Sequence, residues 1–173
     1  MIVAIKVVAR PARLTWRNFK AVAVIPDSDE EAQIAPETTL PERLHPLKVK
    51  DKFRLPDLTV TVVLKSSDTI VIRTADKTAD LLEHEQGHFD LMILSARAMA
   101  ADLEKLEADS PGELQSAVND VQSTHGARAT AVDEEYDRQT DHSRNAAQQR
   151  RWRKLIDEAL GKTGVTALDG NPL

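Results

Sequence analysis

The stretch that decides the fold is Leu81-Leu-Glu-His-Glu-Gln-Gly-His-Phe-Asp90. It lies in a proline-free run with apolar residues at helical spacing, so we expect a long helix over residues 78–108. Residues four apart share one face of a helix, which allows His84 and His88 to point at one ion. Glu85 is one position further round and can reach a water molecule on that ion. The spacing predicts a zinc site with Glu85 as the general base.

The neighbours of this motif indicate that the helix packs against the rest of the protein. Leu82, Phe89 and Met92 surround the histidines with apolar side chains. A buried histidine pair needs a partner for its polar atoms, and a metal ion supplies one. The chain contains no cysteine, so a transition metal depends on imidazole, carboxylate and water as ligands.

A zinc site of this kind needs a third protein ligand, and the first helix does not offer one. Residues 136–143, Tyr-Asp-Arg-Gln-Thr-Asp-His-Ser, hold three potential ligands where a second helix gives way to a third. An imidazole on such a turn is well placed to reach a neighbouring helix. We therefore predict His142 as the third ligand, with Asp137 and Asp141 as alternatives.

Other polar residues have supporting roles in this hypothesis. The hydroxyl of Tyr136 is a candidate donor to a developing oxyanion. Asp90 or Asp137 is a candidate to orient a ligand histidine through its second ring nitrogen. His45 lies in a proline-rich segment and His125 lies in the middle of the second helix, and we expect both at the surface.

The rest of the chain divides into a strand-rich half and a helical half. Short β-branched runs predict strands at residues 2–8, 21–25, 58–64 and 69–72. The last two runs resemble a hairpin, and the polar, proline-rich residues 27–52 predict a long functional loop. Ser110, Pro111 and Glu113 form a capping box that begins a second helix ending near residue 140. A third helix is expected over residues 144–160, ended by Gly161.

These elements predict an α+β fold in a single domain over residues 1–173. Residues 1–74 are strand-rich, residues 75–161 are helical, and residues 162–173 form a loose tail. A small, mostly antiparallel N-terminal sheet is expected to pack on the long helix with the His-Glu-x-x-His motif, followed by two further helices.

The bulk composition limits the class of protein. The 173 residues carry a net charge of -5, which weighs against a nucleic-acid binder, because such proteins usually show a basic face. The basic run at residues 150–154 is expected to be a solvated helix face. No stretch approaches the roughly 20 apolar residues of a membrane span, so no membrane partner is expected. Residues 2–9 are too short and wrongly flanked for a signal peptide.

Three separated blocks of the chain carry a family resemblance. They are Leu14-Thr-Trp-x-x-Phe19, Leu81-Leu-x-His-Glu-Gln-x-His-Phe-Asp90 followed by Ser95-Ala-Arg97, and Tyr136-Asp-x-x-Thr140-x-His142 with Gln149 and Trp152. In this order they resemble the bacterial domain of unknown function numbered 922, a family described as predicted secreted zinc-dependent proteases.

The resemblance implies a zincin-like metallopeptidase fold, one Zn²⁺ ion and hydrolysis by a water molecule that Glu85 assists. It supports His142 as a ligand, and it implies a secreted or periplasmic location. Trp16 and Phe19 are expected to be core anchors. Gly87 is a poor helix former inside the motif, and we expect it to allow a close approach by a strand or substrate.

The sequence therefore favours a zinc-dependent metallopeptidase acting on a peptide or protein substrate, which pairs with a sheet edge at residues 58–64. The alternative is a non-catalytic, zinc-stabilised binding module in which Asp137 or Asp141 closes the open coordination position. A third hypothesis is an interaction protein without metal. Elemental analysis separates the third from the others, whereas substrate and oligomeric state are left open by the sequence.

Overall fold

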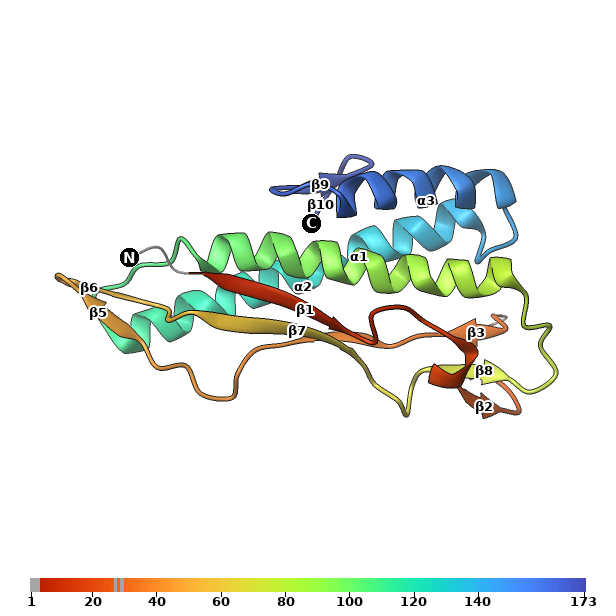
Figure 1. Cartoon of the computed structure of the whole chain (residues 1–173), viewed down its shortest axis with the longest axis horizontal. Helices are drawn as coiled ribbons and strands as arrows, with labels where there is room; N and C mark the ends of the chain where they lie inside the picture. The colour runs from red at the N-terminus through yellow and green to blue at the C-terminus, as the bar shows by residue number, and fades with distance from the viewer. Residues whose placement is uncertain (1–3, 27, 29) are drawn as a thin grey trace.

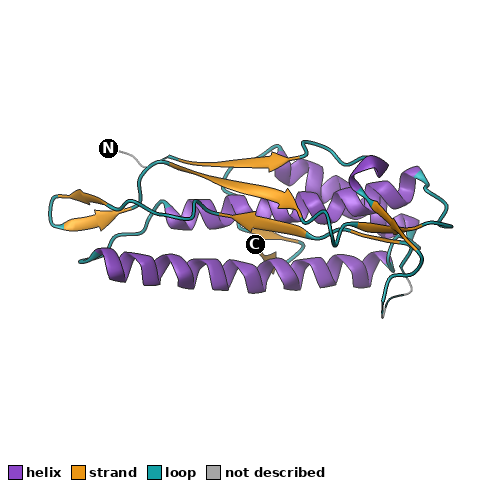
Figure 2. Cartoon of the chain, turned by 90° about the horizontal axis from the view of Figure 1, so that it is seen from below, coloured by secondary structure: helices purple, strands orange, loops and turns teal. Residues whose placement is uncertain are grey.

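Three helices and a set of short strands make up the chain in a computed structural model that describes residues 4–26, 28 and 30–173. The helices are α1 (Ala79–Leu103), α2 (Pro111–Thr140) and α3 (Ala146–Leu160). The molecule is elongated, and α1 lies between the strands on one side and α3 on the other (Figure 1). Seen from below, the strands lie over the helices along much of their length (Figure 2). The predicted α+β class is confirmed.

The helix boundaries follow from capping residues. Thr78 caps α1, and its hydroxyl oxygen accepts a hydrogen bond from the backbone N–H of Leu81 at 3.1 Å. Ser110 caps α2 as predicted. The helix α1 ends at Leu103, earlier than expected, because Ala108 exchanges two backbone hydrogen bonds with Phe53, at 2.8 and 3.0 Å. This bridge holds the residues after α1 in an extended form.

The strands form two mixed three-stranded sheets rather than the mostly antiparallel sheet that we expected. In the first, β7 (Leu58–Leu64) is central, parallel to β1 (Ile5–Arg10) and antiparallel to β4 (Pro36–Thr39). In the second, β8 (Ile70–Ile72) is central, parallel to β2 (Lys20–Val22) and antiparallel to β3 (Ala32–Gln33). Residues 2 and 3 of the first predicted strand lie outside the described residues.

The predicted hairpin of residues 58–72 and the predicted loop of residues 27–52 are both wrong, for one reason. Strands β7 and β8 belong to different sheets and do not pair with each other. Both pair instead with the extended segment that contains β3 and β4. Residues 27 and 29 of the predicted loop lie outside the described residues. Further along it, β5 (Leu47–Val49) pairs with β6 (Lys52–Arg54).

Two apolar clusters stabilise this arrangement. The larger joins the strands to α1 and the start of α2, and it contains Phe19, with Trp16 of a short 3-10 helix (Trp16–Asn18) packed against it. The smaller joins the three helices around Trp152, which is 0% exposed. Both predicted aromatic anchors of the early block therefore contact the core.

The C-terminal tail is not loose. Residues after α3 form a small hairpin of β9 (Ala167–Leu168) and β10 (Asn171–Pro172). Leu168 and Leu173 are buried in the smaller cluster, and the backbone N–H of Leu173 donates to Thr166 at 2.9 Å. The burial of these two leucines outweighs the flexibility expected from the glycines and proline of the tail.

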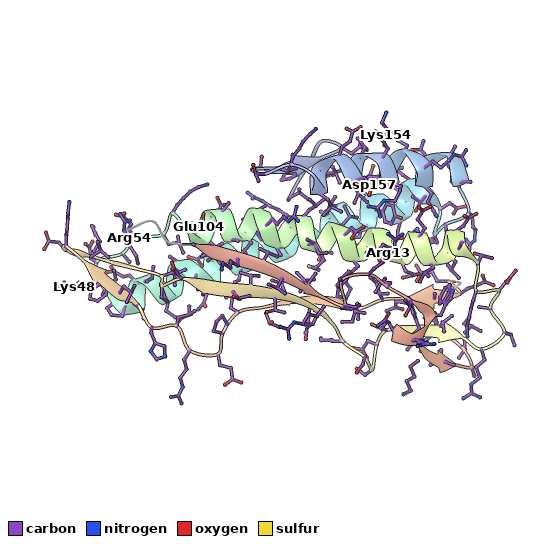
Figure 3. All side chains as sticks on the ribbon, in the orientation of Figure 1. Arg13, Lys48, Arg54, Glu104, Lys154 and Asp157 are labelled. Atoms are coloured by element: carbon purple, nitrogen blue, oxygen red, sulfur yellow. The ribbon has the colours of Figure 1, made fainter. Side chains whose placement is uncertain are left out.

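The two ends of the molecule differ in character. Lys48, Arg54 and Glu104 lie at the end that carries the β5–β6 hairpin (Figure 3). The first half of α1, the end of α2 and β3 gather toward the opposite end (Figure 1). Within the described residues, no helix is long and apolar enough to cross a membrane.

Candidate metal centre

His84 and His88 lie one turn apart on a buried face of α1, with 3% and 9% of their surfaces exposed. Their Nε2 atoms are 3.1 Å apart. The rings meet edge to face, with centroids 4.7 Å apart. The structure thus brings the two ring nitrogens together, as the helical spacing predicted.

The third atom at this point comes from Asp137 on α2. Its Oδ1 atom lies 3.2 Å from Nε2 of His84 and 3.0 Å from Nε2 of His88. Burial alone would raise the pKa of Asp137, but the two adjacent imidazoles outweigh this effect and hold the pKa well below its ordinary value. Asp137, an alternative in the sequence analysis, is therefore the acid that converges with both histidines.

The chemistry of these three atoms fits a divalent cation. Two imidazole nitrogens and a carboxylate oxygen are donors that zinc takes in catalytic sites, with a further position left for water. Neutral imidazoles present lone pairs, and three lone-pair atoms can face one another at this separation only with a proton or a cation between them. The group is one that could hold a metal ion.

Asp133 fixes the orientation of His88. Its Oδ1 atom accepts a hydrogen bond from Nδ1 of His88 at 2.6 Å. Burial would lower the pKa of His88, yet Asp133 and Asp137 together raise it well above its ordinary value. The sequence analysis missed Asp133, although its place one helical turn before Asp137 is the signal that could have found it.

Glu85 is buried beside the histidines, with 2% of its surface exposed. Its Oε2 atom has no hydrogen-bond partner within the described part of the chain. Burial raises the pKa of Glu85 to about 7, the nearby charge of His88 opposes the rise, and Glu30 adds to it. A carboxyl group with this pKa can both accept and release a proton near neutral pH.

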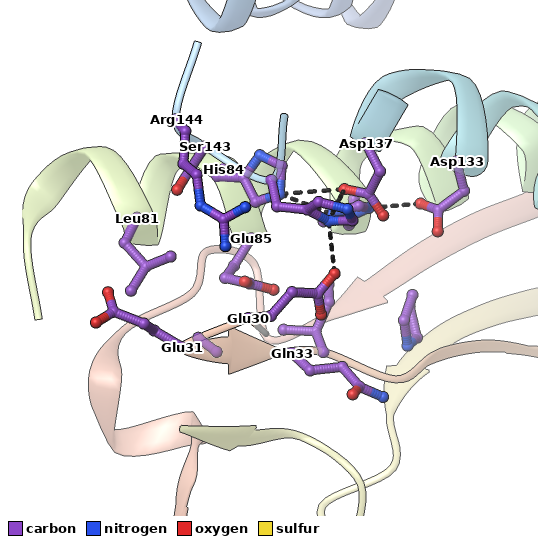
Figure 4. Close-up of a pocket in the computed structure, with 15 residues that line it drawn as sticks. Glu30, Glu31, Gln33, Leu81, His84, Glu85, Asp133, Asp137, Ser143 and Arg144 are labelled. Carbon is purple, nitrogen blue, oxygen red and sulfur yellow. Dashed lines mark hydrogen bonds and ion pairs between the residues drawn. The ribbon is translucent and has the colours of Figure 1, made fainter. Parts of the chain in front are cut away.

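A cavity of about 550 Å³ opens next to these groups. The helices α1 and α2 form one wall, and residues 30–36, which include β3, form the facing wall (Figure 4). Glu85 projects from α1 toward Glu30 across this space (Figure 4). The three converging donors and the buried acid therefore share one accessible pocket.

His142 lies at the rim of the same cavity rather than among the converging donors. Its Nδ1 atom pairs with Oε1 of Glu30 at 2.6 Å and is 3.6 Å from Oδ1 of Asp137. The residues from Asp141 to Ser143 all have positive φ, between 48° and 75°. This left-handed run reverses the chain after α2 and carries the imidazole toward residues 30–36.

Residues 47–143 match the family described as "Bacterial protein of unknown function (DUF922)". The chain belongs to this family. No curated protein and no solved structure matches it. The match spans the motif of α1 together with Asp133, Asp137 and His142, so the whole constellation except Glu30 falls within the DUF922 region.

Tyr136 of this DUF922 chain contacts His84 and helps to hold it in place. Its hydroxyl donates to the backbone carbonyl of His84 at 3.2 Å, and its ring stacks on that of His84 with centroids 4.9 Å apart. The side chain is buried and does not line the cavity, so its hydroxyl does not lie where the predicted oxyanion would form. Gly87 allows this packing, because a Cβ atom there would lie 2.7 Å from Cζ of Tyr136.

The positions of Asp90 and Asp141 also differ from the roles predicted for them. Asp90 contacts neither histidine: it accepts hydrogen bonds from Gln86 of the same helix at 2.8 Å and from Arg153 at 2.7 Å, and the second bond joins α1 to α3. Asp141 is exposed, and its carboxylate lies 3.9 Å from Arg144. For Asp90 the helical register directs the side chain to the face opposite the histidines, whereas Asp141 lies beyond the end of α2 in the left-handed turn.

The two remaining histidines differ in burial. His45 is exposed, as expected. His125 is 4% exposed, and its Nε2–H donates to Oδ2 of Asp102 at 3.0 Å. The expectation of a surface position for His125 is wrong, because α2 packs directly against α1 at this point and the ion pair satisfies one ring nitrogen.

In this DUF922 protein the metal-free state is expected to weaken as pH rises, through Glu85. Its folded pKa of about 7 exceeds the ordinary value of 4.5, so its stabilising contribution is complete below about pH 4.5 and is lost as pH rises through 7. We expect the free energy of unfolding of Glu85→Gln, measured relative to the parent with chelator present, to be greater at pH 8 than at pH 4. The expected change in this difference is on the order of 3 kcal/mol. Urea unfolding at both pH values measures this.

The control for this experiment is Glu134→Gln, at an exposed carboxylate of α2. It should change the free energy of unfolding by less than about 0.5 kcal/mol at either pH. A stability difference between Glu85→Gln and parent that does not vary with pH would contradict the assignment.

Proposed function

We propose that this chain is a zinc-dependent metallopeptidase with a zincin-like fold. His84, His88 and Asp137 hold the ion in this proposal. The observation that carries it is the convergence of their three donor atoms, with separations of 3.0 to 3.2 Å, beside the buried carboxyl group of Glu85. A peptide or protein is the proposed substrate.

A bound zinc ion lowers the pKa of a water molecule to about 7 and polarises a carbonyl oxygen. Glu85 takes up a proton at its carboxylate and delivers it to the leaving amine. Asp133 keeps the Nδ1 proton on His88, which leaves the Nε2 lone pair free for the ion.

Asp137 takes the place in this proposal that the sequence analysis gave to His142. The imidazole of His142 lines the cavity and is half-buried. It is the group on the rim from which a ring N–H can donate to an oxyanion in the cavity. That role replaces the one expected of Tyr136.

The path of the substrate also differs from the expected one. Strand β7 is central in its sheet and offers no free edge. Among the strands of the described residues, β3 pairs with β8 alone, and its residues line the cavity. Because backbone groups alternate in direction along a strand, Ala32 and Ile34 direct theirs toward the edge that β8 does not occupy. An extended peptide is proposed to pair with this edge.

A non-catalytic zinc module is the second candidate. The observation in its favour is that Asp137 belongs to a second group of possible ligands, formed with Glu30 and His142. Four protein ligands drawn from both groups would close the site and stabilise the fold without chemistry. The unpartnered Glu85 carboxyl has no use in a closed site, so we favour the open one.

The deciding experiment compares the parent with His142→Ala. After chelation and reloading, the parent should bind one zinc ion per chain and cleave unstructured peptides, and renewed chelation should stop cleavage. The open site predicts that His142→Ala keeps its zinc, whereas a closed site predicts loss of zinc from this variant. If the zinc-loaded parent cleaves no member of a broad peptide library, the peptidase proposal is contradicted.

Asp133→Asn should weaken zinc binding by about 10- to 100-fold, the usual effect of removing a carboxylate that orients a ligand histidine. The matched control is Asp141→Asn, in an exposed side chain of the turn after α2. It should bind zinc like the parent. Competition with a chromogenic chelator gives both dissociation constants, and equal affinities of the two variants would contradict the role of Asp133.

A further inference from the structure

A second cavity, of about 210 Å³, lies between α1, α2 and β4. Its walls are mainly apolar, and they include the flexible side chains of Met92 and Met99 and the small side chains of Ala96 and Ala129. Thioether sulfurs make favourable contacts with aromatic rings, and methionines adapt to the shape of a ligand. The walls therefore suit an aromatic group.

Two buried polar atoms interrupt these apolar walls. Ser95 and His125 both line the cavity and are 3% and 4% exposed. Within the described part of the chain, the hydroxyl of Ser95 and Nδ1 of His125 have no hydrogen-bond partner. Because Nε2 of His125 is engaged by Asp102, Nδ1 is the ring nitrogen available to a ligand. The walls of the cavity thus contain a ring nitrogen and a hydroxyl that could pair with a ligand.

Gly126 gives an independent reason to regard the cavity as a site. It lies inside α2, where glycine is less favourable than alanine. A Cβ atom at Gly126 would meet nothing within 4 Å, so no neighbour requires its absence. Gly126 lines the cavity and is exposed, so the cavity opens to solvent at this point.

The cavity lies about one helical turn from the metal centre along both helices. Met92 follows His88 by one turn on α1, and Ala129 precedes Asp133 by one turn on α2, a displacement of about 5.4 Å. Strand β4, which contributes Thr38 to the cavity, continues the segment that lines the metal centre. An extended peptide advances about 3.3 Å per residue, so it covers this displacement in about two residues.

We propose that this cavity binds a tyrosine side chain of the substrate, about two residues from the scissile bond. The phenol ring packs between the two methionines. Its hydroxyl can both donate and accept, and it pairs with Nδ1 of His125 and with the hydroxyl of Ser95, which gives each unpartnered atom a partner. This inference rests on the proposed peptidase function for the identity of the substrate, but the cavity and its polar atoms exist without the metal.

The first test uses p-cresol and the metal-free protein, with binding followed by NMR. We expect saturable binding that perturbs resonances of residues around the cavity. Gly126→Leu should abolish it, because the new side chain enters the cavity. The matched control is Gly112→Leu, also an open position in α2 but outside the cavity, which should bind like the parent. Circular dichroism on both variants shows that the helices are intact.

Toluene is the second probe and tests the polar atoms. It should bind about tenfold more weakly than p-cresol, because it lacks the hydroxyl. Ser95→Ala should reduce that preference. Equal binding of toluene and p-cresol, or binding of p-cresol that Gly126→Leu does not affect, would overturn the assignment.

The final test measures kcat/KM on peptides that differ only in tyrosine, phenylalanine or alanine at these positions. The tyrosine peptide should be preferred by the parent, and Gly126→Leu should remove that preference. Cleavage without any preference overturns the pocket and leaves the peptidase proposal standing. If p-cresol binds but no peptide is cleaved, the proposed function fails, and with it the substrate role of the pocket.

Discussion

Replacing Glu85 by glutamine is expected to lower kcat/KM for peptide hydrolysis by about 10²- to 10⁴-fold, the usual contribution of a positioned general base. Glutamine has nearly the same shape but cannot take up a proton at neutral pH. Glu85 is not among the three converging donors, so the variant should still bind one zinc ion per chain. Parallel measurements of zinc content and peptide cleavage check the two halves of this expectation.

Glu83→Gln is the matched control on the same helix. Glu83 does not line the cavity that contains Glu85. Its variant should keep both the zinc ion and the activity of the parent. If Glu85→Gln were as active as Glu83→Gln, the carboxylate would have no part in the chemistry. Loss of zinc from Glu85→Gln would instead indicate that Glu85 supports the site structurally.

Gly87→Ala should destabilise the protein, by about 1–3 kcal/mol, the usual cost of overpacking a core. The new Cβ atom would lie 2.7 Å from Cζ of Tyr136 and closer still to its hydroxyl oxygen. Tyr136 cannot move aside easily, because it is 2% exposed and its ring packs between His84 and Trp152. Urea unfolding measures the loss, and zinc affinity should fall with it because His84 is displaced.

The same substitution at Gly126 serves as the control and should have the opposite sign. Nothing lies within 4 Å of a Cβ atom at this position. Alanine in a helix interior is favoured over glycine by about 0.5–1 kcal/mol, so Gly126→Ala should stabilise the protein. If both alanine variants were stabilised, the contact between Gly87 and Tyr136 would not constrain the site.

The elements with strong local signals were predictable. Ser110 and Pro111 mark the start of α2, and Gly161 ends α3, because capping depends on residues close together in the chain. The strand pairing was not predictable in this way. Whether β7 pairs with β8 or with β4 depends on which segment covers the apolar face of α1, and that choice is a sum over contacts between distant residues.

The candidate site also has a part that local sequence predicts and a part that depends on the tertiary structure. The sequence by itself determined that His84 and His88 face one point, with Glu85 beside them, because the geometry of a single helix fixes the relation between residues four apart. Only the tertiary structure showed that the Asp137 carboxylate, and not the His142 imidazole, lies beside both histidines. The packing of α1 against α2 brings the acid to the histidines, and the left-handed turn after α2 takes the imidazole to Glu30.

The supporting residues also required the tertiary structure. The sequence showed that Tyr136 and Gly87 were unusual, but their mutual contact exists only because two helices cross at that point. The same packing buries His125 beside Asp102 and closes the tail over Trp152 through Leu173. Local chemistry therefore fixed which groups could act, and the approach of segments far apart in the chain fixed which of them meet, because helix packing is decided by many weak contacts together.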